Sequence, residues 1–326
     1  MMFDNKKILI TGGTGMIGYQ LCKLLKKKGA DVTAVSLDKE PDLPSEVHFI
    51  SADLRNISSC EAICKDMDIV FHLAGVTGSP KMTFESPSTF MVANLLINTN
   101  MLEAATRCNV KKYLFTSTYG VYGPDELMKE DDMWMNPPSD ADKYAGWAKR
   151  MGELQVEANQ KQFPWQSSFI VRPANVYGPR GNFDPKNSMV VASLIRRLVN
   201  KENPFIVWGD GSAIRDFIYA EDVARGMIFV MENNITDPLN LGSGSGTSIK
   251  NLVLKLIDIF DLDIDVQWDI SKPSGDKKRI LDTTKAQILG FEPETSLSDG
   301  LIKTIKWYDK NRGKLEGRFN AFKESP

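Results

Sequence analysis

Short apolar runs alternate with segments of helical periodicity along the first half of the chain. Each run is short enough for a buried strand, and the runs cover residues 8–10, 31–37, 47–50, 68–73 and 112–116. Residues 15–28 and 90–108 repeat apolar positions at the spacing of a helix. Strands that alternate with helices in this way predict a parallel, doubly wound α/β sheet with helices on both faces.

The pattern changes from about residue 175. Loops rich in Gly, Pro, Asn and Asp begin at residues 177–185, while helical patterns persist at 190–199 and 249–260. We therefore expect a first domain at residues 1–174 and a smaller α/β lobe at residues 175–326. Open sheets of this type bind ligands at their carboxyl edge, so the lobe is expected to cover that edge and bind the substrate. Later segments can return to the first domain, so that the two interleave.

Composition removes several functional classes. The 40 basic and 42 acidic residues leave a net charge of -2, which gives no field to attract nucleic acid or an anionic membrane. With two histidines and four cysteines in no C-x-x-C pair, the chain matches neither a Ser-His-Asp hydrolase nor a metal site. It shows no signal-peptide core and no apolar run of membrane-spanning length. We expect a cytoplasmic protein without a metal ion.

A glycine-rich turn joins the first strand to the first helix. The sequence from Thr11 to Gly18 contains G-x-x-G-x-x-G. Glycines permit a tight turn and a close approach to a pyrophosphate, which the free N–H groups of the helix N-terminus then bind. We therefore expect an NAD(P)-binding Rossmann domain, with a cofactor loop made of Gly12, Gly15, Met16, Ile17 and Gly18.

Two acidic residues after later strands fit the same cofactor. Asp38 could bind both ribose hydroxyls of NAD, whereas Ser36 with Lys39 could accept the extra phosphate of NADP. A solvated loop acid is the alternative for Asp38. Asp53, followed by Leu54, could accept a hydrogen bond from the adenine amino group, although an acid in that place is often a helix cap. We expect NAD and leave NADP open.

Motifs over nearly the whole chain resemble the extended short-chain dehydrogenases/reductases, which include nucleotide-sugar epimerases, dehydratases and reductases. Beside the glycine loop they are Phe71-His72-Leu73-Ala74-Gly75, Asn94, the stretch from Ser117 to Gly123, and Lys149 with Glu153. The resemblance implies that Leu73, Ala74 and Gly75 line the cofactor site. Parts of the second half resemble GDP-fucose synthase, at residues 182–188, 208–211, 215–217, 272–275 and 279–282.

The resemblance also implies a catalytic site. In the family a tyrosine acts as general acid or base, a lysine one helical turn later lowers its pKa and holds the ribose, and a hydroxyl orients the sugar oxygen. Thr118 matches the hydroxyl residue and Lys149 the lysine. The tyrosine should lie four residues before the lysine, but this chain has Ala145 there, with Tyr144 beside it.

Three explanations of Ala145 stay open. A helix that starts later or bulges would let Tyr144 fill the role, the alanine could be an engineered replacement, or the natural protein uses different proton chemistry. Adjacent helix positions point about 100° apart, so a slip of one residue requires a distortion. We predict Tyr144 as the proton-transfer residue, with mere packing as the alternative.

This chain lacks the residues that two reactions of the family require. The dehydratases carry an Asp-Glu pair where this chain has Tyr119 and Gly120, and GDP-fucose synthase inverts two carbons with a cysteine and a histidine where it has Gly120 and Met189. Hydride transfer at one sugar carbon, commonly C4, remains. It could be reduction of a 4-keto sugar, oxidation of a 4-hydroxyl, or 4-epimerisation with tightly bound NAD. Because of Ala145, a non-catalytic dinucleotide-binding sensor is the alternative from another class.

Substrate and partner follow from the same resemblance. Arg197, Arg215 and Arg279 match phosphate-binding residues, and Asn175 matches an asparagine that contacts the nucleotide-sugar. The helices that bear Asn94 and Lys149 form a dimeric four-helix bundle in similar proteins, which implies a homodimer. We predict an NAD(P)-dependent nucleotide-sugar oxidoreductase or epimerase, with a GDP-sugar as the expected substrate.

Overall fold

The centre of the molecule is a seven-stranded sheet. A computed structural model describes residues 2–39, 41–272 and 276–314, so that Pro273, Ser274 and Gly275 of the stretch resembling GDP-fucose synthase lie outside the described residues. The strand order is β11-β6-β5-β4-β1-β2-β3, and every pair is parallel. This sheet confirms the predicted doubly wound α/β fold.

The strands are β1 (Lys7–Thr11), β2 (Asp31–Ser36), β3 (His48–Ser51), β4 (Ile69–His72), β5 (Lys112–Thr116), β6 (Ser167–Pro173) and β11 (Leu239–Leu241). The first five begin and end within one residue of the predicted runs. Their side chains alternate between two cores, as in β1, where Ile8 and Ile10 face one side and Leu9 faces the other. Burial on both faces explains why these strands are continuous apolar runs.

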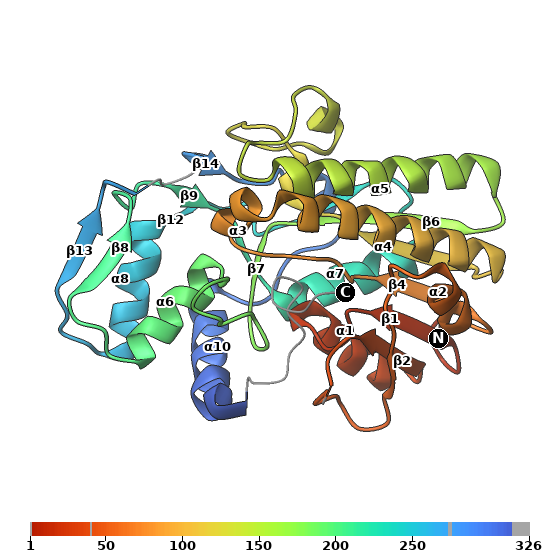
Figure 1. The fold of residues 1–326 in the computed structure, drawn as a ribbon, viewed down its shortest axis with the longest axis horizontal. Coiled ribbons are helices and arrows are strands. Elements are labelled where there is room, and N and C mark those ends of the chain that lie inside the picture. Colours follow the sequence, from red (N-terminus) through yellow and green to blue (C-terminus); the bar gives the residue numbers. More distant parts are fainter. Residues whose placement is uncertain (1, 40, 273–275, 315–326) are drawn as a thin grey trace.

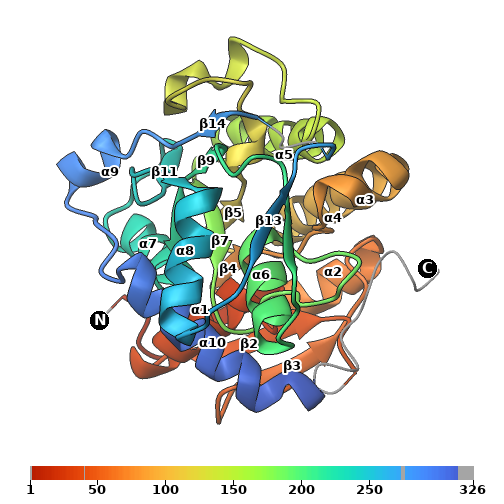
Figure 2. The ribbon, with the colours of Figure 1, turned by 90° about the vertical axis from the view of Figure 1, so that its left-hand side faces the viewer.

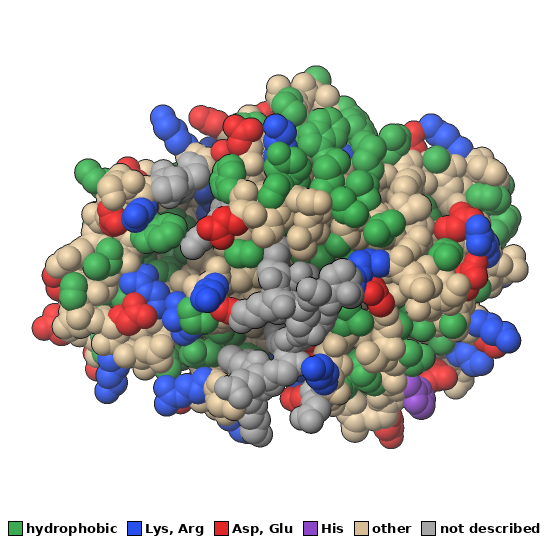
Figure 3. Space-filling model, viewed as in Figure 1, with side chains coloured by type: hydrophobic (Ala, Val, Ile, Leu, Met, Phe, Trp, Pro, Cys, Tyr) green, Lys and Arg blue, Asp and Glu red, His purple; other side chains and the backbone are tan. Residues whose placement is uncertain are grey.

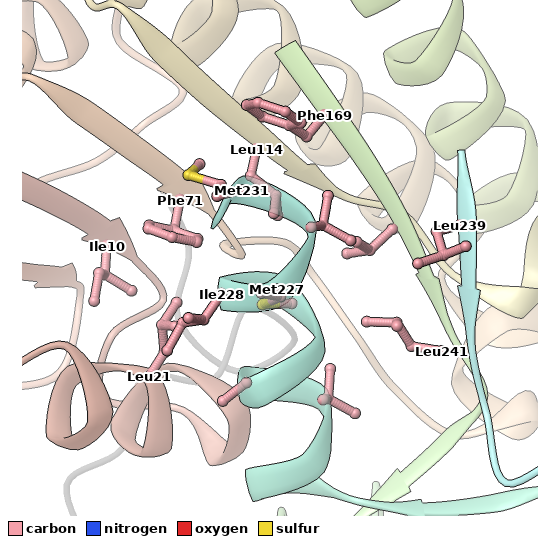
Figure 4. Close-up of a cluster of buried hydrophobic side chains, with 14 of the residues drawn as sticks. Ile10, Leu21, Phe71, Leu114, Phe169, Met227, Ile228, Met231, Leu239 and Leu241 are labelled. Atoms are coloured by element: carbon pink, nitrogen blue, oxygen red, sulfur yellow. The ribbon is translucent and has the colours of Figure 1, made fainter. Parts of the chain in front are cut away.

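Helices cover both faces of the sheet (Figure 1). On one face lie α1 (Met16–Lys27) and α7 (Ala220–Glu232), whose side chains Leu21, Met227 and Met231 pack with Ile10 and Phe71 of the sheet (Figure 4). On the other lie α2 (Ile57–Cys64), α4 (Pro87–Arg107) and α5 (Lys143–Gln162), which share the second core. Within the described ranges, no helix is both long and apolar enough to cross a bilayer.

A smaller lobe lies beside the sheet (Figure 2). It contains α6 (Val190–Val199), α8 (Ile249–Phe260), α10 (Leu297–Asn311) and a parallel pair of strands, β8 (Phe205–Trp208) and β13 (Val266–Asp269). Their apolar faces share one core that includes Leu194, Leu252 and Leu301. Helices α6 and α8 begin and end at the predicted residues.

The remaining elements of the molecule are short. They are α3 (Pro80–Glu85), α9 (Thr284–Leu289), β7 (Asn175–Tyr177), β9 (Ile214–Arg215), β10 (Phe217–Tyr219), β12 (Thr247–Ser248), β14 (Lys278–Arg279), η1 (Tyr119–Val121), η2 (Glu130–Trp134) and η3 (Arg312–Lys314).

The two parts interleave, so a single boundary between residues 174 and 175 does not describe them. After residue 175 the chain returns to the first domain, where α7 packs against α1 and β11 pairs with β6. A parallel strand at this edge needs a crossover, and α7 supplies it by burying its apolar face against the sheet. Neither β6 nor β11 was among the predicted strands.

Candidate active site

The turn between β1 and α1 has the shape that a pyrophosphate site requires. Gly12 has a φ of +69°, which favours glycine, and a Cβ there would lie 3.1 Å from the backbone N of Ala74. Helix α1 begins after Gly15, an N-cap without a side chain, so the first N–H groups of the helix have no side-chain cap. Bare backbone at a helix N-terminus fits the diphosphate of a nicotinamide dinucleotide.

The segment after β4 lies between this turn and Lys149. The N–H groups of Leu73 and Ala74 both donate to Thr11 Oγ1 at 3.1 Å. A Cβ on Gly75 would lie 2.9 Å from Asn94 Oδ1 and 3.6 Å from Lys149 Nζ. The structure thus brings the glycine loop, residues 73–75 and Lys149 together at the carboxyl edge of the sheet.

His72 is a structural residue of this edge. Its Nδ1 lies 2.8 Å from Thr11 Oγ1, which already accepts two N–H bonds and so directs its own proton to the ring. Its Nε2 lies 3.3 Å from Asn98 Oδ1. Burial, with the charge of Lys149, lowers the pKa of His72 to about 3, so the ring is neutral at physiological pH.

The acids after β2 and β3 differ in their surroundings. Asp38 is half-buried, and its backbone N–H donates to Ser36 Oγ at 3.1 Å, which turns the chain at the end of β2. Asp53 is paired with Arg55 at 2.6 Å, and this guanidinium lowers the pKa of the carboxyl. The alternative of Asp53 as a helix cap is wrong, because Asn56 caps α2.

The side chain of Leu54 is buried in the core beside α2. The Leu54 carbonyl accepts hydrogen bonds from Cys60 Sγ at 3.3 Å and from Asn100 Nδ2 at 3.2 Å. Contact of Asp53 and Leu54 with the adenine stays a prediction.

Helix α5 carries Lys149 and settles one explanation of Ala145. The helix is an uninterrupted α-helix from Lys143, so it neither starts after Tyr144 nor bulges. Tyr144 and Lys149 are five positions apart and project about 140° from each other, whereas Ala145 is about 40° from Lys149. The Tyr144 ring lies 5.9 Å from Lys143 Nζ. The distortion on which the prediction of Tyr144 relied is absent, and its role in proton transfer stays a prediction.

The Lys149 ammonium has donors to spare. It donates to the carbonyl of Thr116 at 2.8 Å and lies 4.8 Å from the centre of the Phe115 ring. Burial lowers the pKa of Lys149 to about 8, and the charge of Glu153 opposes that shift. Because an ammonium has three N–H bonds and the described residues accept one, two are left for a ligand such as a ribose.

Thr118 stands at the carboxyl end of β5, before η1. Its Oγ1 accepts the N–H of Gly120 at 3.1 Å, and the hydroxyl proton has no acceptor among the described residues. The proton is therefore available to a sugar oxygen.

Three predicted substrate residues gather around Tyr119, the residue that follows Thr118. Arg215 and Arg279 are paired in register on β9 and β14. The Arg279 guanidinium lies 4.4 Å from the centre of the Tyr119 ring, and the Tyr119 hydroxyl donates to Asn175 Oδ1 at 2.9 Å. Arg279 is 4% exposed, and its Nε and Nη2 have no hydrogen-bond partner among the described residues. A buried cation with unused donors fits an anionic ligand.

Arg197 makes its contacts in the smaller lobe, away from this cluster. Its Nε donates to Glu202 at 2.5 Å and its Nη2 to the carbonyl of Ile206 at 2.6 Å. The guanidinium covers the Phe205 ring at 4.5 Å. Contact of Arg197 with a phosphate stays a prediction.

Asp142 was not among the residues selected from the sequence. It is the N-cap of α5 and forms an ion pair with Arg279. Only its place before that helix could have indicated it.

The glycine turn, Thr118 and Lys149 at one sheet edge define a dinucleotide-binding protein of the extended short-chain dehydrogenase/reductase type. The chain belongs to the NAD dependent epimerase/dehydratase family, whose model matches residues 8–242. This confirms the predicted resemblance, and a nicotinamide dinucleotide is the cofactor that the family uses.

Relatives are similar over nearly the whole chain. It is 31% identical over 318 residues to the "Probable GDP-L-fucose synthase 1" of Oryza sativa subsp. japonica, covering 94% of this chain and 92% of the relative. It is 27% identical over 316 residues to a dTDP-4-dehydro-6-deoxy-D-allose reductase of Streptomyces bikiniensis, covering 93% and 96%. A UDP-glucose 4-epimerase of Thermotoga maritima, solved with UDP-glucose, matches with a TM-score of 0.83 and 30% identity, covering 94% and 99%.

Proposed function

We propose that this protein is an NAD(P)-dependent nucleotide-sugar oxidoreductase that transfers hydride at one sugar carbon, C4 of a GDP-sugar, as a 4-keto reductase or a 4-dehydrogenase. The observation that carries the proposal is the place of Arg215 and Arg279. Two arginines are paired on neighbouring strands, and one of them, with unused buried donors, lies over the ring of Tyr119, the residue that follows Thr118.

The arginine pair suits a diphosphate. Arg215 Nη1 is bound by the carbonyls of Ile214 and Asp276, which fixes the guanidinium plane. Arg279 is fixed by Asp142 and by the Tyr119 ring. Two oriented guanidinium groups can bind neighbouring phosphate oxygens in forks, which a free sugar or an alcohol would not need.

The chain's own residues would orient the sugar and the cofactor. The bound nicotinamide supplies or accepts the hydride. Thr118 donates to the oxygen of the reacting carbon, and Lys149 holds the ribose with its remaining N–H groups. Reduction of a ketone also requires one proton on that oxygen, and Tyr144, the neighbour of Ala145 in the sequence, is the residue proposed to supply it.

NAD is the cofactor that Asp38 favours. Its carboxylate at the end of β2 can accept both hydroxyls of an adenosine ribose, and it would repel the phosphate that NADP carries there. Measuring the affinities of the chain for NAD and for NADP tests this. Asp38→Asn should reduce the ratio of the two affinities.

The choice of a GDP-sugar rests on the second half of the chain. Its stretches resemble GDP-fucose synthase, and relatives with that name are similar over nearly the full length. Double epimerisation is not part of the proposal, because Gly120 and Met189 carry no group that exchanges a proton at neutral pH. The similarity to a dTDP-sugar 4-ketoreductase supports hydride transfer at one carbon without double epimerisation.

A nucleotide-sugar 4-epimerase with tightly bound NAD is the second candidate. The similarity to the UDP-glucose 4-epimerase favours it. A non-catalytic dinucleotide sensor, from another class, is favoured by Ala145 alone. An epimerase converts its sugar without net change in cofactor absorbance, and a sensor binds cofactor without turnover.

The test is turnover of GDP-, UDP- and dTDP-sugars and of their 4-keto forms. Nicotinamide absorbance and product NMR are followed together. Stoichiometric change in cofactor with one sugar supports the proposed function, and sugar conversion without it supports the epimerase. Failure of every sugar, also with Ala145→Tyr, would favour the sensor.

We also propose that the chain forms a homodimer through α4 and α5. These helices lie side by side, and their exposed apolar side chains include Val92, Leu96 and Leu154. In Figure 3 apolar side chains gather over this part of the molecule. Burial of such a patch against a second copy would remove it from water.

A further inference from the structure

Gly120 and Asp142 form a matched pair at the substrate end of the site. A Cβ on Gly120 would lie 3.2 Å from Asp142 Cγ and 3.4 Å from its Oδ1. The backbone of Gly120 is not in the left-handed region, so a side chain here would meet a tight contact with Asp142 and no backbone strain. The carboxylate of Asp142 therefore fills the volume in which a side chain at position 120 would begin.

Asp142 reaches this place from the N-cap of α5. Seven positions separate it from Lys149, so the two residues project within about 20° of each other around the helix axis. The carboxylate thus lies on the face of α5 that carries Ala145 and Lys149. Because Gly120 N–H is bound to Thr118 Oγ1, the carboxylate is also close to the residue expected to orient the sugar.

The two oxygens of the carboxylate have different surroundings. Oδ2 forms the ion pair with Nη1 of Arg279, which leaves Nη2 of that arginine without a partner among the described residues. Oδ1 accepts no hydrogen bond from the described residues. The side chain is 29% exposed, so a ligand can reach it.

We propose that Asp142 joins the two halves of the substrate site, with Oδ2 orienting Arg279 toward the diphosphate and Oδ1 accepting a hydroxyl of the sugar. This inference rests on the proposed function. Asp142 and the Tyr119 ring hold Arg279, and Asp276 Oδ2 lies 3.6 Å from its Nε, so that Nη2 is the donor left for a diphosphate. A guanidinium that is already held costs less to order when the diphosphate binds. Asp142 is then a residue that sets affinity and sugar choice, and not a proton carrier.

The experiment is calorimetric titration of the NAD-saturated protein with GDP, GDP-mannose, UDP and UDP-glucose. Asp142→Asn keeps the size of the side chain and removes its charge. One of the two diphosphates should bind the unaltered chain. We expect Asp142→Asn to lower the affinity for that diphosphate by about tenfold to a hundredfold, as for a lost charge-assisted hydrogen bond. The sugar-bearing form should lose more than the bare diphosphate, because it also loses the contact with Oδ1. NAD affinity should be unchanged.

Asp140→Asn is the matched control. Asp140 is exposed, two residues away, and carries the same charge, so its replacement should leave all four affinities within about twofold. A second test starts from Gly120→Ala, which keeps the carboxylate of Asp142 itself. Gly120→Ala should weaken the same probe by pushing the carboxylate aside, and it should have no further effect in an Asp142→Ala background.

Each result has one meaning. Unchanged or tighter binding by Asp142→Asn overturns the inference, and tighter binding would show that Asp142 competes with the diphosphate for Arg279. Unchanged binding with slower turnover also overturns it, in favour of proton transfer by Asp142. If the unaltered chain binds none of the four probes, the result contradicts the proposed function itself and not the role of Asp142 within it. If Asp142→Asn fails to fold, unchanged binding of the probe by Gly120→Ala overturns the inference.

Discussion

Glu153 and Arg172 form an ion pair inside the protein, with 2.6 Å between Glu153 Oε2 and Arg172 Nη2 and both side chains at most 3% exposed. The same guanidinium donates to the Tyr122 hydroxyl and to the carbonyl of Glu130. Glu153 also accepts the hydroxyl of Ser117, so the pair joins α5 to β6 and to the segment that carries Thr118. The ion pair therefore holds α5, the helix that carries Lys149, against the sheet edge.

Loss of the Arg172 charge should strongly destabilise the fold. Arg172→Met leaves Glu153 buried without its cation, and we expect the free energy of unfolding to fall by about 3–5 kcal/mol. Urea denaturation followed by circular dichroism measures this. Lys161→Met, which breaks an exposed pair with Glu157 on the same helix, should cost less than about 0.5 kcal/mol. Equal losses in both variants would contradict the argument.

Lys149 should make stability depend on pH. Its pKa is lowered to about 8 by burial, below the value near 10.4 of an unfolded lysine, so folding disfavours the charged form. Between these values the unfolded chain binds the extra proton, and this group makes stability rise with pH. Below pH 8 its full cost is present. Lys149→Met should therefore stabilise the cofactor-free chain by about 1–2 kcal/mol at pH 7 and by much less at pH 10.

Urea denaturation of both proteins at the two pH values measures the difference. A Lys149→Met variant that is less stable at pH 7, or whose advantage is the same at pH 10, would show that the ammonium is not destabilised by burial.

The sequence predicted the parts of this fold whose cause is local. The apolar runs of the first five strands and the glycine turn are each decided by neighbouring residues, and the predicted bounds of α6 and α8 agree with the structure. β11 has three residues and is a strand only because β6 offers it an edge, so no local pattern indicates it.

The site follows the same division. Thr118, Lys149 and the glycine loop lie in motifs, whereas the contact of Asp142 with Arg279 joins residues 137 positions apart. The expected distortion near Tyr144 is absent because nothing in the sequence from Lys143 onward interrupts an α-helix. A resemblance indicated where a tyrosine should be, and no pattern in the chain could say what replaces it.

A tyrosine at position 145 tests whether Ala145 marks a disabled site. Ala145 lies on the Lys149 face of α5, one turn before the ammonium, so Ala145→Tyr would place a phenol where that cation lowers its pKa. If the site is disabled and Tyr144 only packs, turnover of the productive nucleotide-sugar should rise about a hundredfold. Ala145→Phe adds the same ring without a hydroxyl and should give no gain.

Tyr144→Phe separates the remaining explanations. If the unaltered chain is already active, Ala145→Tyr adds nothing and Tyr144→Phe abolishes turnover, Tyr144 carries the proton despite its direction from the helix. If Tyr144→Phe is as active as the unaltered chain, Tyr144 only packs.

Neutralising Arg215 should weaken binding of the diphosphate. Arg215→Gln removes one of the two guanidinium groups, and we expect the dissociation constant for the nucleoside diphosphate to rise about tenfold or more. Calorimetry with GDP and UDP measures it. Arg225→Gln breaks an arginine ion pair with Asp222 on α7 and should leave this affinity unchanged. A similar loss in both variants would point to general charge rather than a site.

A charge on the outer face of α5 should separate the proposed dimer. Leu154 is 44% exposed in one chain, and burial of its side chain against a second copy would make a carboxylate there costly. We expect light scattering to give twice the chain mass of 36.5 kDa for the unaltered protein and a single chain for Leu154→Glu. Leu254→Glu, at a comparably exposed leucine on α8, should remain dimeric. A mass of one chain for the unaltered protein would contradict the dimer, and dissociation of both variants would place the contact elsewhere.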